Sequence, residues 1–183
     1  MMEPAIALVE TNSIAAGILA GDAMVKKAEV QLLEARSICP GKYMVLISGE
    51  VGPVGESYQV GVASAADALV DQLFLPNVHP SVFPALMSAS PPRGDVALGI
   101  VETVTASVCI VAADAAVKAA DVQLLEIRLA NGLGGKSFVL MEGTVSDVEA
   151  SVAAGVELVR EAGLLVRQVI IPQLHEQMRE KIL

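Results

Sequence analysis

In the first half of the chain, the spacing of apolar residues alternates between that of a β-strand and that of an α-helix. A short apolar run at 5–10 predicts a buried strand, and apolar positions at helical spacing from 13 to 27 predict a helix. Strand-like runs at 30–36 and 43–48, joined by a short turn, are typical of an antiparallel hairpin. Small residues from 57 to 70 favour a second helix, and a last strand begins at 73. This order predicts an α+β fold, in which a four-stranded antiparallel sheet of βαββαβ (ferredoxin-like) order carries its helices on one face.

The second half of the chain repeats the first. Residues 7–36 align without a gap on residues 99–128, and the alignment resumes after the hairpin turn, which is two residues longer in the second copy. We therefore expect two tandem βαββαβ domains, at 1–90 and 96–183. The linker at 91–95 lies in a stretch that gathers Pro, Gly and Ser without an apolar period. A more polar helical segment at 173–182 is expected at the surface.

Composition narrows the classes of function. The chain is 54% hydrophobic but only 3% aromatic, so its apolar area comes from small aliphatic side chains, and we expect much of it to lie between subunits. Acidic residues interrupt each apolar stretch well short of the ~20 residues that a bilayer requires, which argues against a membrane span. A net charge of −9 with few basic clusters argues against nucleic acid and anionic membranes as partners. The N-terminal segment lacks the pattern of a secretory signal, so the cytoplasm is the expected compartment.

The two cysteines occupy dissimilar contexts, and a structural disulfide is not expected. Cys39 lies in the hairpin turn, whereas Cys109 replaces Gly17 in the aligned helix and is predicted to be a core residue. The histidines, His79 and His175, do not align in the repeat and lack partners at metal spacing, so both are predicted at the surface or an edge.

Two pairs of charged residues recur in the copies. Glu10 and Glu102 each follow an apolar strand, and their equivalence favours a scaffold role over acid–base catalysis. Asp22 and Lys26 stand four residues apart, as do Asp114 and Lys118, which is the spacing of an ion pair on a helix surface.

Three recurring motifs resemble those of bacterial microcompartment shell domains. They are Val-Glu-Thr at 9–11 and 101–103, Asp-Ala-x-Val-Lys at 22–26 and 114–118, and a Gly-Lys that ends both hairpin tips. Two such domains in one chain resemble the tandem shell proteins, and the tip Ile-Cys-Pro-Gly-Lys at 38–42 resembles that of the T-type shell protein of propanediol-utilisation microcompartments.

The resemblance implies a flat homotrimer whose six domains imitate a hexamer and tile with other shell proteins around enzymes, in the shell of a bacterial microcompartment in the cytoplasm. It places Lys26 and Lys118 at the tile edge. An edge arginine, often found in a Pro-Arg-Pro-His segment of such proteins, has no counterpart at 80–83 or 172–175. Both hairpin tips would surround a central pore; their residues are Ile38, Cys39, Pro40, Gly41, Lys42, Asn131, Gly132, Leu133, Gly134, Gly135 and Lys136.

The T-type resemblance further implies one [4Fe–4S] cluster per trimer, with Cys39 of three chains as ligands and a non-protein fourth ligand. The Gly41 amide could hydrogen-bond a cluster sulfide, and Lys42 could offset the negative charge of the cluster. We therefore expect a structural protein rather than an enzyme. The cluster would transfer electrons across the shell, and encapsulated redox enzymes are among the expected partners.

Other readings stay open on the residues alone. Three thiolates and a water also suit zinc, and Cys39 could be an ordinary thiol or form a disulfide. The pore could instead be a conduit for a metabolite or cofactor without a cluster. Outside the shell family, the same fold could serve a trimeric ligand sensor or a small enzyme.

Overall fold

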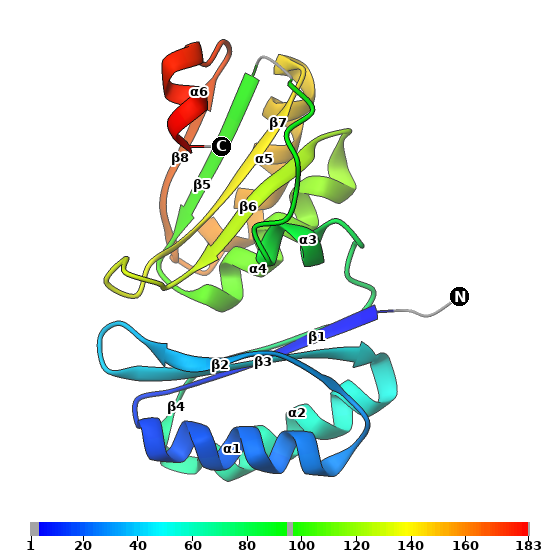
Figure 1. The fold of residues 1–183 in the computed structure, drawn as a ribbon, viewed down its shortest axis with the longest axis vertical. Coiled ribbons are helices and arrows are strands. Elements are labelled where there is room, and N and C mark those ends of the chain that lie inside the picture. Colours follow the sequence, from blue (N-terminus) through cyan, green and yellow to red (C-terminus); the bar gives the residue numbers. More distant parts are fainter. Residues whose placement is uncertain (1–3, 95–96, 183) are drawn as a thin grey trace. The chain divides into compact units, whose positions relative to one another are not determined.

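The computed structural model describes residues 4–94 and 97–182, and it divides into two compact units, Met1–Val78 and His79–Leu183 (Figure 1). Each unit contains one four-stranded antiparallel sheet. Within the described residues, no helix is both long and apolar enough to cross a membrane.

The first unit follows the predicted βαββαβ order. Its sheet has the strand order β2-β3-β1-β4, and α1 and α2 pack together over one face of that sheet. The split βαβ arrangement predicted from the sequence is therefore confirmed. The elements are β1 (Pro4–Thr11), α1 (Ile14–Lys27), β2 (Gln31–Ile38), β3 (Lys42–Glu50), α2 (Val51–Ala65), the 3₁₀ turn η1 (Ala66–Ala68) and β4 (Leu69–Leu75).

The second unit repeats this fold, with the strand order β6-β7-β5-β8 and with α4 and α5 on one face of the sheet. It adds one short helix before the repeat and one after it, and Figure 1 shows the last of these beside β8. The elements are α3 (Val82–Leu86), β5 (Ala97–Thr103), α4 (Ala106–Ala119), β6 (Gln123–Leu129), β7 (Ser137–Gly143), α5 (Val145–Glu161), β8 (Leu165–Ile171) and α6 (Glu176–Ile182).

Small residues let the helices lie close to the sheets. A Cβ atom at Gly61 of α2 would come within 2.5 Å of the Met24 side chain and 3.4 Å of Val9. Met24 and Val9 belong to the buried cluster between the sheet and the helices of the first unit. A larger side chain at Gly61 would therefore push α2 away from α1.

The second helix of the first unit begins earlier than its sequence pattern predicts. We expect a helix over 57–70 and a strand from 73, whereas α2 starts at Val51 and β4 starts at Leu69. Gly52 and Gly55 lower the helix propensity of the first turns, yet α2 forms there and packs on α1 and on the sheet. Packing thus overrides local propensity in these turns.

The compact units divide at Val78 and His79, ahead of the predicted linker. Residues 79–90, assigned to the first domain from the sequence, pack with the second unit because α3 contacts β6 and α4 and buries Val82, Ala85 and Leu86. Of the predicted linker, residues 91–94 form neither helix nor strand, whereas Asp95 lies outside the described residues, as does Val96.

Candidate functional site

The first hairpin tip carries an exposed thiol. The last paired residues of β2 and β3 are Ile38 and Lys42, so Cys39, Pro40 and Gly41 form the turn between them. Ile38 is buried and anchors the tip, while Cys39 is exposed. Gly41 has a φ of +69°, which favours glycine, and no atom lies within 4 Å of the Cβ that another residue would carry there. The turn therefore presents its sulfur and its backbone to the surroundings.

The lysine that ends this tip is held by a buried carboxylate. Lys42 Nζ lies 2.6 Å from Glu10 Oε1, and the side chains are 24% and 3% exposed, respectively. Glu10 of β1 pairs with Met44 of β3, so Lys42 is its diagonal neighbour on the same face of the sheet. Because this ion pair already balances its charge, Lys42 differs from the free cation that the sequence suggests beside a cluster.

The second tip contains no thiol and is richer in glycine. Gly132, Gly134 and Gly135 adopt φ values of +70°, +64° and +92°, which other residues rarely accept. At its base, the Ala130 N–H donates to Ser137 Oγ at 3.1 Å. Asn131 and Gly132 are exposed, and Leu133 is half-buried. This tip offers backbone groups rather than reactive side chains.

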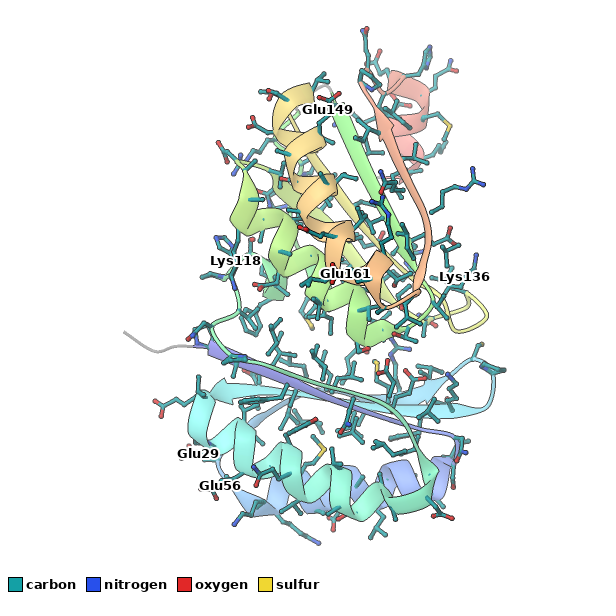
Figure 2. The ribbon with its side chains drawn as sticks, turned by 180° about the vertical axis from the view of Figure 1, so that it is seen from behind. Glu29, Glu56, Lys118, Lys136, Glu149 and Glu161 are labelled. Atoms are coloured by element: carbon teal, nitrogen blue, oxygen red, sulfur yellow. The ribbon has the colours of Figure 1, made fainter. Side chains whose placement is uncertain are left out.

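The second tip repeats the lysine–glutamate pair of the first. Lys136 bonds to Glu102 at the end of β5, although the side chains here are 49% and 30% exposed. Figure 2 shows Lys136 on the hairpin that joins β6 and β7. The predicted scaffold role of Glu10 and Glu102 thus has a structural basis, since each glutamate fixes the lysine of the neighbouring tip.

The described residues of one chain do not gather a set of metal ligands around Cys39. Among residues 4–94 and 97–182, no group of three or more His, Cys, Asp or Glu side chains lies close enough to hold a metal ion.

The other cysteine is a core residue, as predicted. Cys109 of α4 is fully buried, and burial raises the pKa of its thiol to about 12, partly offset by a hydrogen bond with the Thr103 side chain. At the aligned position of α1, a Cβ on Gly17 would lie 2.6 Å from Tyr43 Cβ. The second repeat carries the smaller Ser137 in place of Tyr43, which leaves more room beside the helix position that Cys109 occupies.

The two predicted edge lysines have different surroundings. Lys26 and Asp22 form a 2.6 Å pair in which both side chains are more than half exposed. Lys118, which Figure 2 labels, forms the equivalent pair with Asp114 in α4. Here Asp114 is buried and also accepts a 2.7 Å hydrogen bond from the His79 N–H. The segment that begins the second unit therefore covers Asp114, whereas Asp22 stays exposed.

The prediction that His79 and His175 do not correspond is wrong. Strands β4 and β8 align residue for residue, so Pro-Asn-Val-His at 76–79 corresponds to Pro-Gln-Leu-His at 172–175. Both imidazoles accept from the N–H two residues later, Ser81 at 3.3 Å and Gln177 at 3.2 Å. Asn77 and Gln173 then occupy the place of the arginine in a Pro-Arg-Pro-His segment.

One buried carboxylate that the sequence analysis missed lies on the face of the second sheet opposite α4 and α5, where it binds groups from two other segments. Glu142 of β7 is fully buried, pairs with Arg179 of α6 at 2.8 Å, and accepts N–H groups of Arg93 and Gly94. The aligned residue in the first repeat is Ser48. That replacement of a small polar residue by an acid within an apolar strand is the signal that could have indicated it.

Comparison with known proteins agrees with this architecture. The BMC domain family matches residues 5–78 and 97–174. The chain is 46% identical to the bacterial microcompartment shell protein PduT of Citrobacter freundii, over 97% of this chain and 96% of that protein. A crystal structure of a microcompartments protein from Desulfitobacterium hafniense DCB superposes with a TM-score of 0.93 at 51% identity, covering 98% of this chain and 99% of the other.

A more distant structure shares the fold alone. The fused permuted hexameric shell protein MSM0275 from the RMM microcompartment is 21% identical, with a TM-score of 0.61 over 87% of this chain and 85% of that one. The predicted family and the predicted microcompartment shell location are confirmed by the matched domains and by the relatives. The chain belongs to the family of bacterial microcompartment shell proteins and carries two BMC domains in tandem.

Proposed function

We propose that this protein is a structural tile of a microcompartment shell, that three chains form a flat trimer, and that the trimer carries a [4Fe–4S] cluster at its centre. The tile packs against other shell proteins and has no enzymatic activity of its own. The observation that carries the proposal is the pair of unlike tips on two otherwise matching domains, of which one presents an exposed thiol. Electron transfer to encapsulated redox enzymes is the role proposed for the cluster.

The residues of the first tip suit such a cluster. Thiolates are the usual ligands of iron–sulfur clusters, and the exposed Cys39 of three chains would supply three of them. A bound [4Fe–4S] cluster supplies one-electron redox chemistry. Because nothing crowds Gly41, its backbone would approach the sulfides of the cluster closely.

The remaining residues of the tips would position the thiols and limit the surrounding charge. The Glu10–Lys42 pair fixes the base of the thiol turn on the sheet and adds no net charge next to the sulfur. The glycine-rich second tip, which would alternate with the first around the axis, lets three further backbone segments approach without colliding side chains.

The direct test measures iron and acid-labile sulfide in anaerobically purified protein, with an EPR spectrum after reduction. We expect about four irons per trimer in the wild type and their loss in Cys39→Ser. Cys109→Ser is the matched control, because that thiol is buried and its replacement should leave the iron content unchanged. Trimeric wild-type protein without iron, or equal iron in the Cys39 variant, would remove the cluster from the proposal.

A conduit is the second candidate, and the exposed glycine-rich tip favours it because glycine backbones leave room for a passage. In that case Cys39 only lines the pore. Unchanged electron transfer through shells built with Cys39→Ser would favour the conduit over the redox role.

A further inference from the structure

The two repeats differ in how much of one helix face they expose. In α1, Ile14, Ile18 and Asp22 recur every four residues and therefore lie on one face. Ile18 is 54% exposed and the Asp22 side chain is 52% exposed. The aligned residues of α4, Ile110 and Asp114, are 0% and 7% exposed. The same stripe is thus buried in the second repeat and open in the first.

A specific contact accompanies the buried stripe. The His79 N–H donates to Asp114 Oδ1 at 2.7 Å, while Lys118 pairs with the other carboxylate oxygen at 2.6 Å. His79 is the first residue after the first matched BMC domain, which ends at residue 78. Asp114 therefore receives a backbone donor from the first residue that follows a matched BMC domain.

Both partners of this contact have equivalent residues elsewhere in the repeats. Asp22 corresponds to Asp114, and His175 corresponds to His79 with the same N–H to Nδ1 turn and the same preceding proline. His175 is likewise the first residue after the second matched domain, and it is exposed. Asp22 is bonded to Lys26 in the described structure.

We infer that His175 of one chain docks on the stripe of Ile14, Ile18 and Asp22 of a second copy, where its N–H donates to the Asp22 carboxylate. The contact reproduces between copies the one that His79 makes with Asp114. It is heterologous, because one end of the chain meets a different surface on the next copy, and such contacts form rings when the rotation closes. The inference rests on the proposed trimer and names the surfaces that hold it together.

Disulfide trapping tests the junction. In a Cys39→Ser background, the pair Asp22→Cys and His175→Cys should link different chains under mild oxidation, giving covalent dimers and trimers on a non-reducing gel. The matched pair Asp114→Cys and His79→Cys should link within one chain and run as a monomer. Links within one chain for the first pair, or none while the control pair links, would overturn the junction.

A milder substitution provides a second readout that does not depend on disulfide geometry. Asp22→Ala should raise the trimer dissociation constant about tenfold or more, because each junction loses a hydrogen bond to a charged group. Glu56→Ala is the control, since Glu56 is also exposed and pairs with a lysine, Lys27, at 3.3 Å. Equal effects of the two substitutions would contradict the junction, and a wild type that is monomeric by native mass would overturn the trimer itself.

Discussion

The Glu10–Lys42 pair allows a quantitative test, because the second repeat contains the same pair in a more solvated setting. Lys42→Met keeps most of the aliphatic stem but removes the ammonium group, and it leaves a carboxylate that is 3% exposed without its partner. Breaking a buried pair in this way costs about 3–5 kcal/mol, because the remaining charge is desolvated. We expect the lower end of that range, since Lys42 itself is 24% exposed and water reaches its place.

Lys136→Met is the matched control. Glu102 is 30% exposed and Lys136 is 49% exposed, so water can solvate the carboxylate once the lysine is gone. Exposed pairs contribute about 0–1 kcal/mol, and the control should fall in that range. Adding Glu10→Gln to Lys42→Met should recover much of the lost stability, because an amide costs less to bury than an unpaired charge.

Native-state hydrogen exchange is the appropriate assay, since two units in one chain need not unfold together and exchange reports each separately. A loss of ~3 kcal/mol corresponds to roughly hundredfold faster exchange in peptides from β1 and β3. Peptides from β5 and β7 serve as the internal reference. Equal acceleration by Lys42→Met and Lys136→Met, each in its own unit, would refute the reasoning from burial.

Three further predictions concern other parts of the molecule. In folded protein freed of iron, a maleimide should label one thiol per chain, which Cys39→Ser abolishes, whereas Cys109, with its pKa raised to about 12, should react only after unfolding; two fast thiols would contradict this. Gly17→Cys should lower the melting temperature through overpacking of about 1–3 kcal/mol, and adding Tyr43→Ser should restore part of it, whereas strictly additive losses would show that the two sites do not share space. Glu142→Gln should accelerate hydrogen exchange in α6, because the charged partner of Arg179 is lost, and unchanged exchange there would mean that apolar packing alone holds the helix.

The duplication made most of the fold predictable. Strands and hairpins were readable because each pattern occurs twice, and the family motifs fixed their order. The start of α2 was not readable, since Gly52 and Gly55 weaken the helical pattern and the buried face of Val54, Ser57 and Gly61 emerges only when the helix lies on the sheet.

The candidate site was predictable in its position and not in its electrostatics. Cys39 stood out because it falls in a turn where the repeats differ in length. The Glu10–Lys42 contact depends on the register of β1 against β3, which places two residues far apart in the chain on one diagonal. The correspondence of His79 and His175 was hidden by a second change in length after α2, which only the aligned strands reveal.

The difference between the two hairpin tips shows what is gained when two domains are joined in one chain. In a ring of identical single-domain subunits, every change at the tip is imposed on all positions at once, so a thiol cannot be introduced at alternate places. A chain that carries one Cys39 turn and one glycine-rich turn escapes that constraint, since selection can act on either tip alone. One tip can thereby gain a reactive side chain while the other keeps its glycines, and both sheets retain the same strand order.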